Sequence, residues 1–350
     1  MKLKIGLGKL RLLLALLVVN SHISVGYFLS LGWDPGTIGN YNSGVVAVVI
    51  FFAISGFVMS ALWKEHYEGS REVNRVRLIK VFYLDRLIRL FPQFILYFVV
   101  TLLCIQLLNF ESPFWQSIDF VVLVQNLTIL PSGFYMFLKP HSLFVPQAWS
   151  LGLELTFYAV VPFLLKKWNW RKIYFFAYTS ISFFLLPFFG LINSDWYGYR
   201  LLPGVIFIFI IGVSSKDFSI KRKQTYLISC RLFLGLLLTY SYTRSDLYEL
   251  KFNKEVLLGA LIATFLIPNI STNSSKWDTW CGDLSYGVFL NHILIATLIN
   301  NYFPSYSARI IGVVCLVAIA AVSSGFSYYF VERRALVLRR RLRMSLRETL

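Results

Sequence analysis

Long runs of apolar residues, separated by short polar segments, recur along the whole chain. Most runs hold roughly 20 residues, the length that an α-helix needs to cross a bilayer core of roughly 30 Å. The pattern therefore predicts an all-α, polytopic integral membrane helical bundle with ten transmembrane helices. The predicted spans are residues 9–30, 44–63, 90–109, 147–165, 172–192, 199–214, 225–242, 255–270, 283–301 and 308–331.

One further apolar segment, residues 118–131, does not fit this series. It is short, and Pro131 and Gly133 break the pattern at its end. We interpret it as a re-entrant or interfacial piece of a long outer loop. Counting it as a span would invert the orientation of every later helix.

The basic residues are distributed unevenly over the two sides that the ten spans define. Most of the 34 Lys and Arg residues lie at the N-terminus, in four loops on the same side and in the C-terminal tail. The positive-inside rule therefore predicts that both termini are cytoplasmic. The formal net charge of +17 is then a topology signal and a contact with membrane lipids, and we expect no nucleic-acid partner.

The composition agrees with a membrane protein, because 57% of residues are hydrophobic and only 15% are charged. The four cysteines are dispersed and show neither metal-ligand spacing nor a disulfide framework, so no metal is expected. The basic, apolar start resembles a signal peptide, but no small-residue cleavage site follows it. Residues 335–350 are predicted to form a basic cytoplasmic tail, an amphipathic helix that anchors to the inner leaflet.

Three ionisable side chains fall inside predicted spans. His22 lies about 16 Å along its helix from Arg11, and Glu154 and His292 are expected at a similar depth. Such groups are costly in hydrocarbon and indicate function. We predict that Glu154 fixes the tautomer of His22, so that the pair acts as one general-base unit. For His292, a structural hydrogen bond to a backbone carbonyl explains the residue equally well.

Two weaker motifs lie near the loop between the second and third predicted spans. Arg86 and Arg89 are three residues apart, so they share a helix face at a membrane entrance and suit phosphate groups. Ordinary positive-inside anchoring explains the same arginines, and taken alone it is the stronger explanation. Ser55 and Gly56 form a small pair that lets a helix or a ligand approach closely.

Together these residues resemble the membrane-bound acyltransferase 3 family, which acylates extracytoplasmic sugars and other acceptors. The resemblance covers residues 8–334, and residues 1–334 would form a transmembrane acyltransferase domain. The matching motif residues are Arg11 and His22; Ser55, Gly56 and Phe57; Arg86, Arg89 and Pro92; Trp149, Ser150, Leu151, Glu154, Phe157 and Tyr158; Ser285, Tyr286, Leu290 and His292; and Glu332 and Arg333.

The chain departs from the family pattern at three positions. Asp85 stands where a common variant has a further arginine, Phe289 replaces a tyrosine, and Val49 occupies a position that is often acidic. The soluble SGNH hydrolase-like domain of some relatives is not found in the sequence. Transfer is therefore expected to finish in the membrane domain or on a separate partner.

The resemblance implies an O-acyltransferase of the bacterial inner (cytoplasmic) membrane. The donor would be cytoplasmic acetyl-CoA or another acyl-CoA, with no other cofactor. The acceptor would be a hydroxyl of an extracytoplasmic or lipid-linked glycan, such as O-antigen, capsule or exopolysaccharide. His22 and Glu154 would be catalytic, and Arg11, Arg86 and Arg89 would bind the donor. Substrate-binding or structural polar roles would fall to Ser55, Trp149, Ser150, Tyr286 and His292.

Two other functional classes were weighed against this one. A transporter or flippase for a polysaccharide precursor also uses intramembrane histidine and glutamate, but the chain lacks the paired repeats common in transporters. A purely structural scaffold does not explain the buried charges. An acyl-histidine intermediate competes with direct transfer. The acceptor glycan, the acyl group and a homo-oligomeric state are left open.

Overall fold

The computed structural model describes residues 4–27, 37–38, 41–67, 75–108, 119–138, 143–165, 169–217, 220–271, 274–303 and 310–346. Regular structure in these ranges is helical, apart from a hairpin and an isolated bridge between Ile5 and Ile270. In the hairpin, β1 (Thr37–Ile38) pairs antiparallel with β2 (Tyr41–Asn42). The predicted all-α class is confirmed.

A helix occupies each range that was predicted to span the membrane. These helices are α1 (Leu7–Tyr27), α2 (Ser43–His66), α3 (Arg75–Leu108), α6 (Trp149–Leu165), α7 (Trp170–Phe188), α8 (Leu202–Asp217), α9 (Ile220–Thr243), α11 (Asn253–Leu266), α12 (Lys276–Tyr302) and α14 (Ile310–Ser327). In the described part of the chain, six helical stretches are long and apolar enough to cross a membrane. The chain is therefore a multi-pass membrane protein. With 14 residues, α11 is shorter than the roughly 20 residues of an ordinary span.

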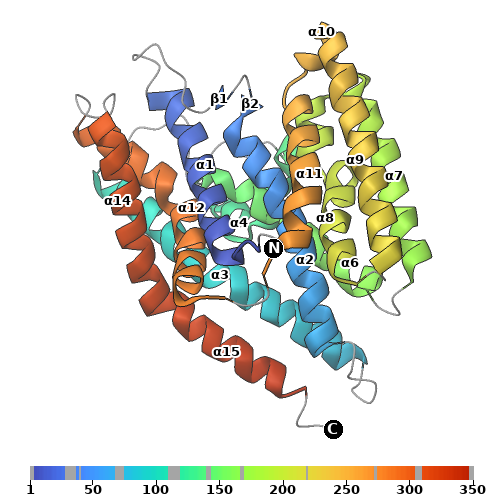
Figure 1. Ribbon diagram of the computed structural model, residues 1–350. Helices are drawn as coiled ribbons and strands as arrows, with labels where there is room; N and C mark the ends of the chain where they lie inside the picture. Colours follow the sequence, from blue (N-terminus) through green and yellow to red (C-terminus); the bar gives the residue numbers. More distant parts are fainter. Residues whose placement is uncertain are drawn as a thin grey trace.

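Helix α2 is central in the bundle, with α1 on one side and α8 and α11 on the other (Figure 1). Its contact with α8 depends on two glycines. A Cβ at Gly56 would collide with the backbone carbonyl of Phe209, and one at Gly212 would collide with that of Ala53. Small residues at such crossings let two backbones approach closely. Gly56 therefore serves helix packing, while its neighbour Ser55 has a different environment, described below.

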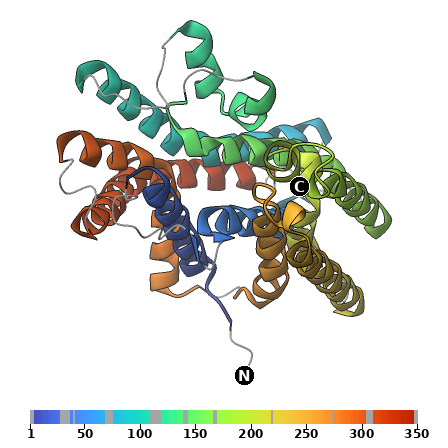
Figure 2. The same ribbon diagram turned by 90° about the horizontal axis from the view of Figure 1, so that it is seen from above.

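In its described part, the segment between α3 and α6 does not cross the bundle. It contains α4 (Phe120–Leu127), η2 (Leu130–Phe134), α5 (Tyr135–Leu138) and η3 (Pro146–Ala148), and it lies at the rim in Figure 2. A helix of eight residues is about 12 Å long, far short of a bilayer core. Gly133 of η2 packs directly against Gly152 of α6. These short elements agree with a re-entrant or interfacial segment.

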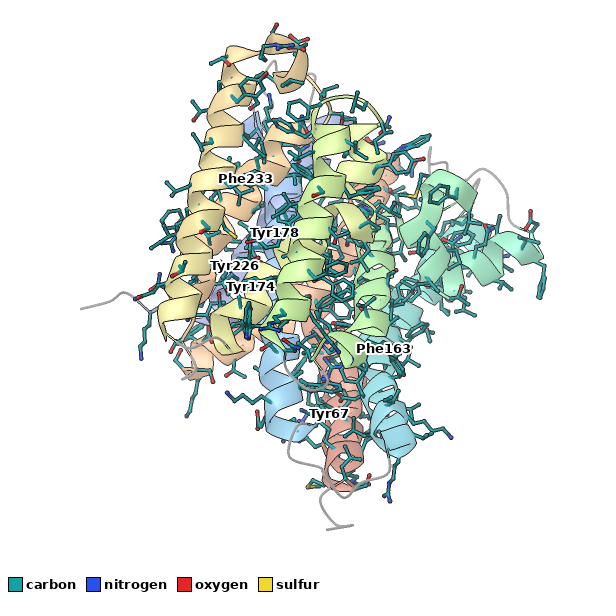
Figure 3. All side chains as sticks on the ribbon, turned by 90° about the vertical axis from the view of Figure 1, so that its right-hand side faces the viewer. Tyr67, Phe163, Tyr174, Tyr178, Tyr226 and Phe233 are labelled. Atoms are coloured by element: carbon teal, nitrogen blue, oxygen red, sulfur yellow. The ribbon has the colours of Figure 1, made fainter. Side chains whose placement is uncertain are left out.

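The half of the bundle that contains α7 and α9 is packed with aromatic rings. The Tyr174 ring of α7 lies 5.5 Å from the Tyr226 ring of α9 and 6.3 Å from that of Tyr178 (Figure 3). Arg231, the cation inside α9, donates to the carbonyl of Thr264 and packs over the Phe265 ring at 4.1 Å. This half is an apolar support for the other helices.

Helix α14 continues through the π-helical turn η6 (Tyr328–Glu332) into α15 (Arg333–Met344), which runs obliquely beneath the bundle (Figure 1). The predicted boundary between residues 334 and 335 falls inside α15. The predicted amphipathic tail helix is present, and it packs against α3. The Arg77 side chain at the start of α3 donates to the carbonyl of Ser345 at 3.1 Å.

Candidate active site

A cavity of about 550 Å³ lies among α1, α2, α3, α6, α12 and α15. Ionisable side chains of both signs line it. The basic ones are Arg11, Arg86, Arg89, Arg339 and Arg343, and the acidic ones are Glu154, Asp278, Asp283 and Glu332. Charges of this density inside a helical bundle are expensive unless they are paired or serve a ligand. The cavity is therefore the first candidate for a functional site.

Glu154 is held inside the cavity by two hydroxyl groups. Ser55 of α2 and Tyr158, one turn later on α6, both donate to its Oε1 atom. The charges of Glu154 and Arg89 both act on the Arg11 guanidinium. Glu154 is thus fixed by neighbours on two helices, and its negative charge faces the arginines of the cavity.

Arg86 and Arg89 share one face of α3, as their spacing predicts, and both line the cavity. Arg86 donates to Asp85 and packs over the Tyr158 ring at 5.7 Å. Arg89 donates to Glu332 of η6. Each guanidinium has a carboxylate partner, so both are held in fixed positions with further N–H donors left over.

Tyr286 of α12 lies beneath Arg89, whose guanidinium carbon is 4.8 Å from the ring centroid. Its hydroxyl donates to the carbonyl of Leu90 at 2.8 Å. Ser285, its neighbour, also lines the cavity. Tyr286 therefore packs against Arg89 of the cavity and ties α12 to α3.

His22 of α1 and His292 of α12 form a second polar centre. Their Nδ1 and Nε2 atoms, respectively, are 3.0 Å apart. The other nitrogen of His292, Nδ1, lies 2.8 Å from the carbonyl oxygen of Phe289. A carbonyl only accepts, so the His292 Nδ1 carries hydrogen, and in the neutral ring its Nε2 accepts from His22 Nδ1–H. This arrangement leaves the lone pair on His22 Nε2.

The predicted contact between Glu154 and His22 is wrong. Glu154 bonds Ser55 and Tyr158, whereas the partner of His22 is His292. The estimate of depth along each helix was too coarse, because it says nothing of the face on which a side chain lies. Glu154 belongs to the cavity and His22 to the histidine pair.

Two aromatic rings stand between these centres. Phe51 of α2 and Phe289 of α12 line the cavity, and their centroids are 6.4 Å apart. The Phe289 ring also lies 6.3 Å from the His292 ring. Neither histidine is among the described residues that line the cavity. The cavity therefore ends within one helical turn of the histidine pair.

Trp149 and Ser150 at the start of α6 have different surroundings. Ser150 lines the cavity and donates to the carbonyl of Gln147. Trp149 packs against Arg200, whose guanidinium carbon is 4.4 Å from the ring centroid. Gln147 donates to the carbonyl of Leu290 at 2.6 Å, which fixes this end of α6 against α12.

Three candidate functional residues were not predicted from the sequence. Arg200 lies close enough to His22 for its charge to act on the imidazole, and it pairs with Asp195. The tail arginines Arg339 and Arg343 line the cavity. Arg200 stands alone in a short loop, and the tail resembles an ordinary anchor, so neither carries a sequence signal of its role. No cluster of three or more metal-ligating side chains occurs among the residues that the structure describes.

The chain matches the model of the acyltransferase domain family over residues 6–329. It is 31% identical over 196 residues to an uncharacterized protein of Aquifex aeolicus, an alignment that covers 53% of this chain and 84% of that protein. It is 22% identical over 349 residues to the peptidoglycan O-acetyltransferase OatA of Listeria monocytogenes, covering 88% of this chain and 53% of OatA. The chain thus spans about half the length of that relative. No solved structure matches it.

Proposed function

The chain belongs to the family of acyltransferase domains, and we propose that it transfers an acyl group, with acetyl as the first candidate, from acyl-CoA to a glycan hydroxyl. The donor is cytoplasmic, and the acceptor is extracytoplasmic or lipid-linked. The observation that carries this proposal is the arrangement of the two centres. An arginine-lined cavity ends one helical turn from His292, which is hydrogen-bonded to His22.

The proposed topology has ten spans in the bacterial inner membrane, with both termini in the cytoplasm. The helices in all ten predicted ranges and the biased distribution of Lys and Arg support it. In this orientation α15 and the arginines of α3 lie at the cytoplasmic side, and the loop that holds Arg200 lies outside. Donor and acceptor then approach the histidine pair from opposite sides.

The proposed donor site uses the phosphate affinity of Arg11, Arg86 and Arg89. Guanidinium groups match phosphate oxygens, and those of Arg86 and Arg89 are already held in place by carboxylates. The pantetheine arm, about 15–20 Å when extended, reaches from these arginines past Ser150 toward Phe289. The thioester is thereby delivered to the end of the cavity nearest His22.

The proposed base is the Nε2 atom of His22. It takes the proton of the acceptor hydroxyl while the oxygen attacks the thioester carbonyl and the thiolate of CoA departs. The Nε2 atom of His292 accepts a hydrogen bond from His22 Nδ1–H before and after this transfer. His292 is therefore a positioning residue that keeps His22 in the productive tautomer, the role that the sequence had indicated for Glu154.

Glu154 has a different proposed role. Its carboxylate offsets the charges of Arg11 and Arg89 near the end of the cavity, and Ser55 and Tyr158 keep it there. Without this negative charge, three arginines would repel one another in a site of low dielectric constant. Glu154 thus shapes the donor site.

Mass spectrometry of surface glycans tests the proposed function. Glycans from cells with the gene are expected to carry ester-linked acyl groups that are missing from cells without it. The precursor pool distinguishes the flippase alternative: a loss of flippase activity would leave unmodified lipid-linked precursor accumulating inside, with the acylation pattern unchanged. That outcome would contradict the proposal.

A further inference from the structure

The C-terminal helix α15 carries two classes of arginine. Arg340 and Arg341 are exposed, as an anchor on a lipid surface requires. Arg339 is only 6% exposed, and Ala335, one turn earlier on the same side of the helix, is buried too. Anchoring to lipid explains the exposed arginines but does not explain why Arg339 is buried.

A carboxylate of α3 bonds the buried side of α15. Asp85 is completely buried. Its Oδ1 accepts a hydrogen bond from Arg339 Nε at 2.9 Å and lies 3.6 Å from Arg343 Nε, while its Oδ2 accepts from Arg86. One negative charge thus faces three guanidinium groups. The balance at this end of the cavity is positive.

The terminal nitrogens of Arg339 and Arg343 have no acceptor among the residues that the structure describes. Arg339 uses only its Nε toward Asp85, and Arg343 uses only its Nε, toward Asp85 and the carbonyl of Arg339. Both side chains line the cavity. Guanidinium donors that line a cavity and are not used by the protein match a ligand with several oxygens, which we expect to complete them.

We propose that Arg339 and Arg343, oriented by Asp85, bind a phosphate group of the donor, so that α15 forms one wall of the donor site. This inference rests on the proposed function, because it takes acyl-CoA as the donor. It also gives a reason for Asp85, which occupies a position where an arginine was expected. Asp85 holds Arg339 and Arg343 of α15 near the position on α3 where the family pattern has a further arginine.

Phosphate oxygens come from two sources at this side of a membrane, a CoA donor and an anionic lipid headgroup. The cavity position favours the nucleotide donor, because Arg339 and Arg343 share the cavity with Arg86 and Arg89. The two sources are separated by measuring binding of CoA and retention of phosphatidylglycerol independently.

The test uses the full chain in nanodiscs of neutral phosphatidylcholine, with isothermal titration of CoA. Arg339→Gln and Arg343→Gln are each expected to raise the Kd for CoA by about 10–100-fold, the range for a lost charge-assisted hydrogen bond. Arg340→Gln and Arg341→Gln are matched controls on the exposed side of the same helix. They are expected to leave the Kd unchanged.

Arg339→Lys protects the test against a folding defect. It keeps the positive charge beside Asp85 but lacks the planar guanidinium fork, so it is expected to weaken CoA binding less than Arg339→Gln does. Size-exclusion profiles and thermal unfolding of each variant without CoA show that the fold is intact. A weaker Kd in a folded variant then reports the lost phosphate contact.

Two results would overturn the inference. If Arg339→Gln binds CoA like the wild type, while mass spectrometry shows that it loses bound phosphatidylglycerol, the arginines serve a lipid headgroup. If all four Gln variants weaken CoA binding equally, only the general basic charge matters. A wild-type chain that binds no CoA would instead contradict the proposed donor itself, and this result is distinguishable because no variant is needed to see it.

Discussion

The cavity and the histidine pair use opposite electrostatics. In the cavity, charged side chains meet charged side chains: Arg89 bonds Glu332, and Arg86 and Arg339 bond Asp85. At His22 and His292 the chain of hydrogen bonds ends on a backbone carbonyl, and no carboxylate among the described residues takes part in it. Charge suits the binding of a phosphorylated donor, whereas a general base must be neutral when the acceptor arrives. Because the two regions are separate, one can bind a charged ligand while the histidines of the other remain neutral.

The largest effect is expected at His22. Because a positioned general base contributes about 10²–10⁴-fold, His22→Ala should lower the rate of acyl transfer by that order with normal expression. The assay is the turnover of acyl-CoA by the purified chain with an isolated glycan acceptor. His66→Ala is the control, since His66 lies at the end of α2 and pairs with Glu65. Retained activity in His22→Ala would make the histidine structural.

Glu154→Gln tests whether the two regions are independent. Loss of the charge next to Arg11 and Arg89 should raise the KM for acyl-CoA by roughly 10–100-fold, the cost of a lost interaction with a charged group. Since Glu154 does not contact His22, the double variant with His22→Gln should lose the product of the two single factors. A double variant no worse than His22→Gln alone would instead indicate that the two residues act as one functional unit.

Arg89→Ala and Arg86→Ala are expected to act on the donor. Each should raise the KM for acyl-CoA by about 10-fold or more and change kcat less, because a phosphate contact is equally present in the bound and transition states. Steady-state kinetics with varied acyl-CoA measures this division. Equal KM values in the variants and the wild type would reduce both arginines to topology anchors.

The smallest effect is expected at His292. In His292→Gln the amide oxygen still accepts from His22 Nδ1–H, so the loss in kcat should be about 2–10-fold, the value of one imperfect neutral hydrogen bond. His292→Leu removes this side-chain acceptor and should lose more. Rescue by Gln relative to Leu, measured as kcat at saturating acyl-CoA, identifies a positioning role. Equal losses in both variants would indicate that His292 acts only through its size.

The sequence was sufficient for the features that depend on position along the chain. Apolar runs located the helices, and the spacing of three placed Arg86 and Arg89 on one face. It was insufficient where the direction of a side chain around its helix determines which residue it contacts. Glu154 and His22 were assigned similar depths, yet Glu154 faces Ser55 on α2. No rule of periodicity predicts which of two helices a single polar residue faces.

The tail shows a second limit of the same kind. Its basic, amphipathic pattern fits a lipid surface, and that pattern is identical whether the apolar side meets lipid or another helix. The distinguishing residue is Asp85, more than 200 positions away, which buries Arg339 against α3. Long-range ion pairs of this type leave no local signal in a single sequence.

Inverted membrane vesicles provide the most direct test of the central claim, which is that a donor bound in the inner cavity is used by a base beyond it. In these vesicles the cytoplasmic face is outermost, and labelled acetyl-CoA is added outside. With the wild type, alkali-labile label is expected on a membrane-associated glycan. With His22→Gln the label should fall by about 10²–10⁴-fold although CoA binding is unchanged. Full labelling by His22→Gln, or labelling only when acetyl-CoA is enclosed in the lumen, would contradict the account.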